Sequence, residues 1–405
     1  METRERSGWP KLINAATGKG NGKILLKNIG MLKNGIKATL SLESGNKTTL
    51  QIINRKNQSI VELKYFNEKL NAVGVQSFCH LIIPMPEETL KTHLKTFKDV
   101  VDSGIPVVVN TLQILPGTKI ATKKIIDSYD MDLKYRLLCR CVGKYNEKYI
   151  IETEKICVAS KDFSLKDYLF ARRFSFIGFL FLYDYFYELS KFIFTAGFSL
   201  FKWLKDIHEN LTTSESPLSK IVNAFYSDAK NEIWDSEEEL LNHFSTKEHY
   251  ERIVSGKTGF NLLTTYQAIV INHYYEEAIT VAVDKFIEQI KQKNDNDDEL
   301  CHQTKEVGSY LLNLYRQCLN PDFERISIGS YDYNIIRWSH EGFLKPLASY
   351  KEKIQVEFAR TAEQQNNLIN YIKRFGSTDE GKGRMMMMRM PSKDIRRKMS
   401  IISSS

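Results

Sequence analysis

The sequence contains few cysteines and no long apolar run that is free of charge. Its six cysteines are scattered over 405 residues, which excludes a disulfide framework and predicts reduced thiols. Residues 1–8 are polar and do not resemble a secretory signal, so we expect a cytoplasmic protein. The densest apolar stretch, Tyr168–Trp203, is interrupted by charged side chains and predicts buried aromatic helices rather than a membrane span. A peripheral membrane contact is an alternative for these helices, because basic residues flank them.

Positive charge is concentrated near the C-terminus. Residues Lys373–Lys398 include nine basic and three acidic side chains, and so supply +6 of the formal net charge of +8. The rest of the chain is close to neutral, which does not favour a nucleic-acid-binding protein. A short basic tail gives only salt-sensitive, sequence-independent attraction. We therefore expect no nucleic-acid partner.

Strands and helices alternate in the first third of the chain. Short β-branched or apolar runs predict strands at Leu12–Thr17, Ile36–Leu42, Val75–Ile83 and Pro106–Leu115. Helical spacing predicts helices at Lys23–Leu32, Lys47–Ile53, Ile60–Val73 and Glu87–Asp102. Such alternation is typical of parallel βα units.

The remaining two thirds of the chain do not continue this alternation and are predicted to be mainly helical. Short extended runs within Tyr135–Lys155 predict a hairpin, and Ile326–Trp338 predicts a strand or extended segment. The other segments predict helices at Leu165–Phe194, Phe198–Leu211, Pro217–Asn231, Ser236–Phe244, Asn261–Lys293, Asp298–Leu319 and Gln355–Phe375. We therefore expect four parts: a βα region at 1–125, a connecting edge segment at 126–163, a helical extension at 164–375 and a basic, disordered tail at 376–405.

Two local motifs are rejected on their spacing. Gly18–Lys23 has the glycines and the lysine of a phosphate-binding loop, but lacks the four-residue gap and the hydroxyl residue after the lysine. Cys139, Cys141 and Cys157 could supply three thiolates, yet the two-residue gap of zinc ribbons and a nearby fourth ligand are missing. We predict unligated thiols here and no metal site.

Three short segments follow predicted strands in a fixed order. They are Ser41-Leu42-Glu43-Ser44-Gly45 with Leu50, Ile53, Arg55 and Asn57 after it, Ile82-Ile83-Pro84-Met85-Pro86-Glu87-Glu88-Thr89, and Leu115-Pro116-Gly117-Thr118. In order and spacing they are similar to S-L-Q/E-S with L-x-x-I-x-R-x-N, I-x-G-x-P-G-E-T and L-P-G-T/S, which follow the fourth, fifth and sixth strands of radical S-adenosylmethionine barrels. Lys134–Leu138 and Arg172–Phe174 are similar to segments of the cobalamin-binding-domain-associated members. Over residues 9 to about 200, the chain resembles that family.

The resemblance implies a fold and cofactors. The fold is α/β, a partial TIM-like (βα) barrel that holds roughly strands three to six, followed by a mainly α-helical C-terminal region. The cofactors of an intact relative are S-adenosylmethionine and a [4Fe-4S] cluster, with cobalamin in some members, and the chemistry is that of the 5'-deoxyadenosyl radical. The family's cluster motif, C-x-x-x-C-x-x-C, is absent from this sequence, and Pro84 and Glu87 stand where the family has glycines.

The resemblance also implies which residues bind S-adenosylmethionine. Glu43 and Ser44 would hydrogen-bond its methionyl or ribose part, and Arg55 would pair with the methionyl carboxylate. Ile82 and Ile83 would lie near adenine, and Glu88 would cap or orient the helix that follows. The alternative for Glu43 and Arg55 is a structural ion pair at a strand end. The alternative for Glu88 is an ordinary helix start.

Two functions follow from these observations. The first is a C-terminal fragment of a radical S-adenosylmethionine enzyme for methyl transfer or rearrangement of an unidentified small molecule, inactive without an N-terminal half or separate subunit. The alternative is a non-catalytic binding or interaction protein that reuses the barrel remnant. The first requires Arg55 to stay near Glu43, which depends on a short helix after Lys47. One continuous helix from Lys47 to Val73 would carry Arg55 roughly 12 Å along its axis.

Overall fold

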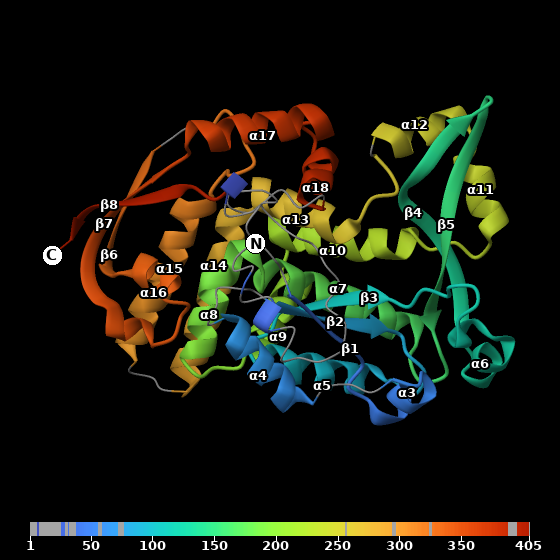
Figure 1. The fold of residues 1–405 in the computed structure, drawn as a ribbon, viewed down its shortest axis with the longest axis horizontal. Coiled ribbons are helices and arrows are strands. Elements are labelled where there is room, and N and C mark those ends of the chain that lie inside the picture. The colour runs from blue at the N-terminus through green and yellow to red at the C-terminus, as the bar shows by residue number, and fades with distance from the viewer. Residues whose placement is uncertain are drawn as a thin grey trace. The chain divides into compact units, whose positions relative to one another are not determined.

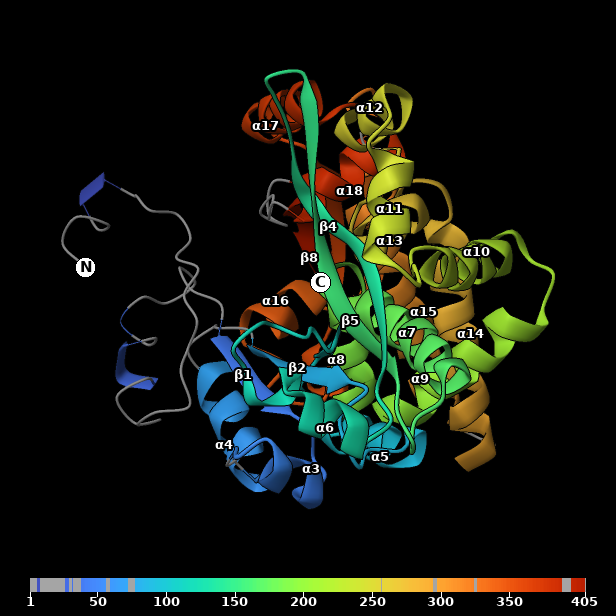
Figure 2. The ribbon, with the colours of Figure 1, turned by 90° about the vertical axis from the view of Figure 1, so that its right-hand side faces the viewer.

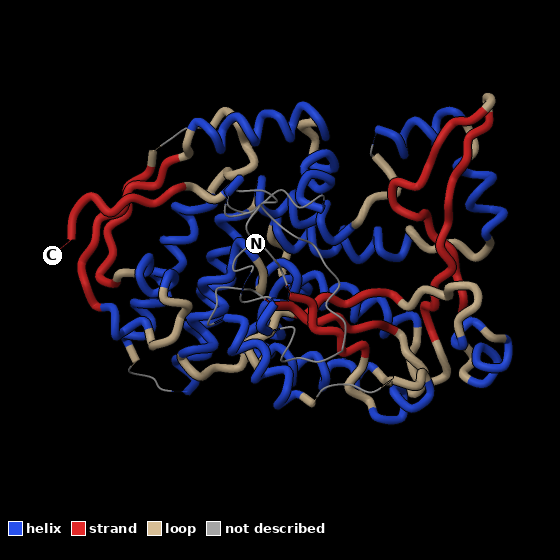
Figure 3. Tube along the Cα trace, in the orientation of Figure 1, coloured by secondary structure: helices blue, strands red, loops and turns tan. Residues whose placement is uncertain are grey.

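The computed structural model describes residues 6–7, 26–28, 31, 38–55, 59–71, 77–255, 257–293, 297–323, 326–387 and 395–404. The protein is a mixed α/β structure in which helices predominate, and its described strands form three small sheets, none of them a closed barrel (Figure 1, Figure 3). The chain divides into two compact units. Unit 1 holds the chain up to Asp132 together with Cys157–Ala171 and Ser199–Phe201, and unit 2 holds Leu133–Ile156, Arg172–Phe198 and Lys202–Ser405.

Unit 1 is built on a parallel three-stranded sheet. Its strands, in spatial order, are β1 (Ala38–Glu43), β2 (Ser77–Ile83) and β3 (Val107–Thr111). The helices between them are α3 (Lys47–Ile52), α4 (Ile60–Asn71) and α5 (Leu90–Val101). Figures 1 and 2 show these helices along the same side of the sheet. Three predicted strands and the helices between them are thus confirmed, whereas the strand predicted at Leu12–Thr17 lies outside the described residues.

Local sequence explains why these elements form. Alternate residues of β2 are buried, and Cys79, Leu81 and Ile83 are fully so, because successive side chains of a strand point to opposite faces of the sheet and these three share the buried face. Helix α5 begins with a capping box in which the Thr92 amide donates to Thr89 Oγ1 at 3.1 Å and the Thr89 amide donates to Thr92 Oγ1 at 2.9 Å. These two hydroxyls satisfy backbone donors that the first turn leaves unpaired.

The second sheet is the hairpin predicted within Tyr135–Lys155. Strands β4 (Asp132–Tyr145) and β5 (Lys148–Ala159) pair with each other, and the two residues between them, Asn146 and Glu147, have positive φ angles of 45° and 63°. Two successive residues in this conformation make the tight turn that matches the twist of antiparallel strands.

Unit 2 is mainly helical. Its longer helices are α9 (Leu200–Thr213), which begins in unit 1, α10 (Pro217–Asn231), α13 (Leu262–His273), α14 (Tyr275–Lys293), α15 (Asp298–Tyr315) and α17 (Ala362–Phe375). Its shorter ones are α8 (Tyr187–Thr195), α11 (Glu237–Phe244), α12 (Lys247–Ser255), α16 (Ile335–His340) and α18 (Asp379–Met387). Aromatic rings fill their interior, as in the stacked pair Phe176 and Phe225, with ring centroids 4.5 Å apart. Phe176 lies on α7 (Leu165–Phe181), which begins in unit 1. Within the described ranges, no helix is both long enough and apolar enough to cross a membrane.

The helix predicted at Gln355–Phe375 is wrong over its first five residues. Strand β7 (Lys351–Ala359) occupies this segment, and α17 starts only at Ala362, directly after its N-cap Thr361, which forms a capping box with Gln364. Ile354, Val356 and Phe358 are buried at every second position, which is strand periodicity. β7 pairs antiparallel with β6 (Ser327–Tyr333).

The prediction that residues 376–405 form a disordered tail is also wrong for the described part of this segment. It contains α18 and strand β8 (Lys398–Ser404), which pairs antiparallel with β7. Just before β8, the buried Arg397 donates from Nη1 to the carbonyl of Asn313 at 2.8 Å and from Nη2 to that of Arg316 at 2.7 Å. These carbonyls lie at the C-terminal end of α15, where helical acceptors lack intrahelical partners. The basic side chain of Arg397 is therefore buried in unit 2, where it satisfies backbone carbonyls.

The Arg397→Ala variant tests this role. We expect it to lower the free energy of unfolding by about 1.5–3 kcal/mol, because two carbonyls lose a charged donor. Chemical denaturation monitored by circular dichroism measures the loss. The control is Lys398→Ala, which removes the same charge from the exposed neighbouring position. Equal stability of the two variants would contradict an ordered tail.

Candidate functional site

The carboxyl ends of the three parallel strands lie at one edge of the sheet of unit 1. Glu43 ends β1, Ile83 ends β2 and Thr111 ends β3, and parallel strands deliver the segments that follow them to the same edge. A cavity of about 230 Å³, open to solvent, is formed there. Its lining residues are Glu43, Ile52, Ile53, Arg55, Ile82, Met85, Leu112, Thr118, Lys119, Ile120 and Ile125. The cavity therefore has an apolar wall with three charged side chains on it.

Arg55 lies close to Glu43 because helix α3 is short. The helix ends at Ile52, and Asn54 has a positive φ of 53°. The Arg55 amide then donates to the Leu50 carbonyl at 2.8 Å, which is the hydrogen bond that closes a left-handed C-terminal cap. Arg55 Nε lies 3.8 Å from Glu43 Oε1, so the predicted proximity of these two residues is confirmed.

The Glu43–Arg55 pair is accessible to a ligand. The Arg55 side chain is 57% exposed and that of Glu43 is 14% exposed. Exposed ion pairs contribute about 0–1 kcal/mol to stability, so a ligand carboxylate can compete for the guanidinium at little cost. Glu43 itself has a positive φ of 65°, which is uncommon for a residue other than glycine. Backbone strain of this kind is typical of binding sites.

Three of the predicted residues lie behind the cavity wall. Ser44, Ile83 and Glu88 are at most 1% exposed and do not line the cavity. Ser44 Oγ donates to Glu88 Oε1 at 2.6 Å, which joins the segment after β1 to the segment after β2. Thr89, rather than Glu88, caps helix α5. Glu88 is thus placed to hold two strand ends together.

Two further hydrogen bonds reinforce this connection. Asn46 Nδ2 donates to the Glu87 carbonyl at 2.7 Å, and Thr49 Oγ1 donates to the Pro86 carbonyl at 2.6 Å. Both donors belong to the start of α3, and both acceptors belong to the loop after β2. The Glu87 carboxylate is held in turn by Lys161 Nζ at 2.8 Å. The two segments beside the cavity therefore form one connected layer.

Sequence reasoning missed Lys119 as a site residue. It lies in a short 3-10 helix, Lys119–Ala121, and directly follows the Leu115–Thr118 motif. That position next to a recognised motif is the signal that could have identified it. Lys119 adds a second cation to the cavity, beside Arg55.

One group of side chains in unit 2 has the composition of a metal site. His302 and Glu306 of α15 and Asp332 of β6 bring their ligand atoms within 4.8 Å of one another. The group already has internal partners, since His302 Nε2 lies 2.9 Å from Asp332 Oδ2 and Lys353 Nζ lies 3.9 Å from Asp332 Oδ1. These ion pairs account for the cluster, and we assign no metal to it.

Burial raises the pKa of Glu88 to about 8, and the hydrogen bond from Ser44 opposes this rise. A carboxyl with a raised folded-state pKa stabilises the fold fully below its unfolded pKa of about 4.5 and loses that contribution as the pH rises toward 8. We therefore expect wild-type stability, relative to Glu88→Gln, to fall by roughly 1.4 kcal/mol per pH unit between about pH 5 and 8.

Denaturation midpoints across this pH range measure the effect. The control is Glu87→Gln, which removes the adjacent carboxylate and leaves Glu88 in place, so the slope relative to Glu88→Gln should remain. Parallel pH profiles for wild type and Glu88→Gln would show that Glu88 is ionised in the folded protein.

Comparisons with known proteins do not assign a family. No protein-family model matches the chain. No curated protein matches it either. The function is therefore argued from the geometry of the cavity together with the motifs that surround it.

Proposed function

We propose that unit 1 is the S-adenosylmethionine-binding part of a radical S-adenosylmethionine enzyme, and that the cavity at the ends of β1–β3 is its site. One observation carries the proposal. Glu43, Arg55 and Ile82, which the motifs connect with this ligand, line a single cavity although they come from a strand end, a helix end and a second strand.

The charges and the apolar wall suit the two ends of S-adenosylmethionine. Its amino-acid end carries a carboxylate and an ammonium group, for which the Arg55 guanidinium and the Glu43 carboxylate are complementary partners. Its adenine is a flat ring, and Ile82 offers an apolar surface in the same cavity. Because the cavity is open, it can hold part of a larger ligand.

The arrangement of the strands also supports the proposal. β1, β2 and β3 follow one another in space in the same order as in sequence, with the connecting helices on one side, as in a stretch of a (βα) barrel. In the proposed correspondence they are strands four to six. Glu87 has a φ of 60°, a conformation that favours glycine, and glycine is the residue that the family motif has at this position.

The residues present do not fit the iron–sulfur cluster. Cys79 and Cys157 are buried, and burial raises the pKa of Cys157 to about 12, which disfavours the thiolate that a cluster requires. Among the described residues, no group of three close ligand atoms includes a cysteine. A reduced cluster, where supplied, would give one electron to the sulfonium of S-adenosylmethionine, whose C5'–S bond would then break to leave methionine and the 5'-deoxyadenosyl radical. The thiolate ligands of the cluster would have to come from another polypeptide segment. We connect no described residue of this chain with cobalamin binding.

A second function is favoured by the same mismatch. Without cluster thiolates, the chain would act as a non-catalytic protein that binds S-adenosylmethionine or a related nucleoside. The cavity serves both functions, and the supply of the cluster distinguishes them.

Titration calorimetry with S-adenosylmethionine tests the site. We expect measurable binding by the wild-type chain. Arg55→Gln should bind at least about tenfold more weakly than the wild type, because a charged hydrogen bond contributes about 1.5–3 kcal/mol. The control is Lys95→Gln on α5, which removes an exposed cation outside the cavity. No binding by the wild type, or equal binding by both variants, would reject the proposal.

Anaerobic reconstitution with iron and sulfide tests the cluster. We expect the isolated chain to form no stoichiometric [4Fe-4S] cluster, because it lacks three converging thiolates. Iron and sulfide content and the electron paramagnetic resonance spectrum after reduction provide the measurement. A stoichiometric cluster would show that cysteines of this chain serve as its ligands.

A further inference from the structure

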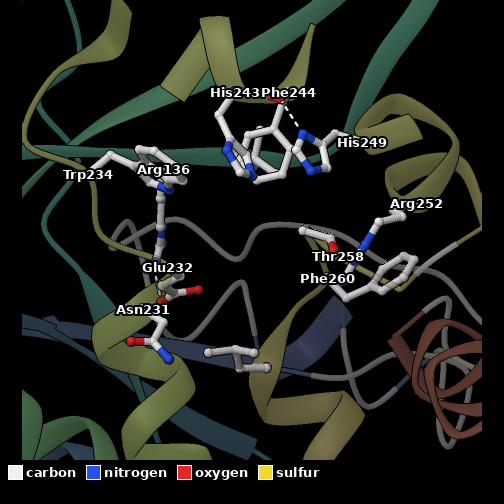
Figure 4. A pocket seen from close by; sticks show the side chains of 13 residues that line it. Arg136, Asn231, Glu232, Trp234, His243, Phe244, His249, Arg252, Thr258 and Phe260 are labelled. Carbon is white, nitrogen blue, oxygen red and sulfur yellow. Dashed lines mark hydrogen bonds and ion pairs between the residues drawn. The ribbon is translucent and has the colours of Figure 1, made fainter. Parts of the chain in front are cut away.

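Unit 2 contains a second, larger cavity, of about 410 Å³. It lies between the hairpin strand β4, the segment after α10, helices α11 and α12, and the start of α13. Its lining residues are Arg136, Leu137, Asn231, Glu232, Trp234, His243, Phe244, His249, Arg252, Thr258, Gly259, Phe260 and Leu262. Figure 4 shows these side chains around one open space. No residue of this cavity takes part in the site of unit 1.

A small hydrophobic cluster supports the cavity. Ile151 of β5 packs with Leu240, Phe244 and Ile253 of α11 and α12, all of them buried. The backbones of Tyr135 and Trp234 exchange two hydrogen bonds, of 2.9 and 2.8 Å, which attach the segment after α10 to the hairpin.

Gly259 lets the opposite wall come close to the hairpin. It has a φ of 76°, and a Cβ atom added there would lie 3.0 Å from Leu137 Cδ1. The cavity is therefore a structured feature of unit 2.

The charges on its wall leave an excess of one cation. Glu232 Oε1 accepts from Arg136 Nη1 at 3.1 Å and from Arg172 Nη2 at 3.2 Å, and Arg136 also pairs with Glu154. These two cations and two anions balance one another. Arg252 is different, because its guanidinium has no hydrogen bond or ion pair with another described residue. It is the uncompensated charge of the cavity.

Aromatic rings supply the rest of the binding surface. The imidazoles of His243 and His249 are stacked with centroids 4.0 Å apart, and the Trp234 ring lies 5.0 Å from that of His243. Figure 4 places Arg252 and Phe260 across the space from Trp234. Burial, His249 and Arg252 all lower the pKa of His243, so the imidazole pair stands in a positive environment. An anion near Arg252 would relieve this repulsion.

We infer that this cavity binds a small planar aromatic compound that carries an anionic group. The anionic group pairs with the guanidinium of Arg252, and the ring packs against Trp234 and the imidazoles of His243 and His249. Among the described residues, the wall combines one cation that has no acidic partner with several aromatic rings. An inorganic anion would contact only the cation, and a neutral ring would contact only the aromatic side chains.

Binding of 1-naphthyl phosphate to the full chain tests the inference. By titration calorimetry at low salt, we expect it to bind at least tenfold more tightly than 1-naphthol, which lacks the charge, and than inorganic phosphate, which lacks the ring. Arg252→Gln should weaken binding about tenfold or more. The matched control is Lys247→Gln, which removes a cation from the exposed face of the same helix, outside the cavity, and should change binding less than twofold.

Tryptophan fluorescence locates the ligand. In a Trp9→Phe background, Trp234→Phe should abolish the emission change that 1-naphthyl phosphate causes, because the two remaining tryptophans, Trp203 and Trp338, are fully buried. Equal binding of 1-naphthol and 1-naphthyl phosphate, or equal losses in Arg252→Gln and Lys247→Gln, would overturn the inference. Arg55→Gln in unit 1 should leave this binding unchanged, so failure here is separable from failure of the proposed S-adenosylmethionine site.

Discussion

Parallel pairing of β1, β2 and β3 is the constraint on which the cavity of unit 1 depends. Each strand leaves the sheet at the same edge, so residues far apart in the sequence converge there. If β1 ran in the opposite direction, Glu43 would lie at the other edge, away from Ile82. The short helix α3 completes the arrangement, because its left-handed cap at Asn54 turns Arg55 back toward the strand ends. The direction of β1 and the short length of α3 together therefore position the charged rim of the cavity, formed by Glu43 and Arg55.

Behind that rim, buried polar groups hold the strand ends in place. An unpaired carboxyl in such a position would be costly, and the Ser44–Glu88 hydrogen bond offsets part of that cost. Burial also favours the neutral form of Glu88, whose pKa rises to about 8. The two acids have different partners: the partly buried Glu43 lines the cavity beside the Arg55 guanidinium, whereas the buried Glu88 connects two segments of the backbone. Their roles differ because their surroundings differ.

In unit 2, arginine side chains of the same charge have different roles, because their surroundings differ. The basic residues near the C-terminus raise the net charge of the chain, yet Arg397 serves helix carbonyls inside the unit. Arg136 and Arg172 are neutralised by acidic partners. Arg252, on a short exposed helix, has no such partner among the described residues, and it faces a cavity with aromatic walls. Of these four arginines of unit 2, Arg252 is the one whose positive charge faces a cavity without an acidic partner among the described residues.

The sequence by itself determined the strands β1 to β5 and most of the helices, because apolar periodicity and capping residues act over a few positions. It also placed Glu43, Arg55 and Ile82 at one edge, since strand direction follows from βα alternation. It did not determine the strand at Lys351–Ala359, whose partners lie far away in the chain. Tertiary structure alone decided the burial of Glu88, and it alone assembled the cavity around Arg252. Those features depend on contacts between segments that share no local pattern, and burial and charge compensation arise only when such segments meet.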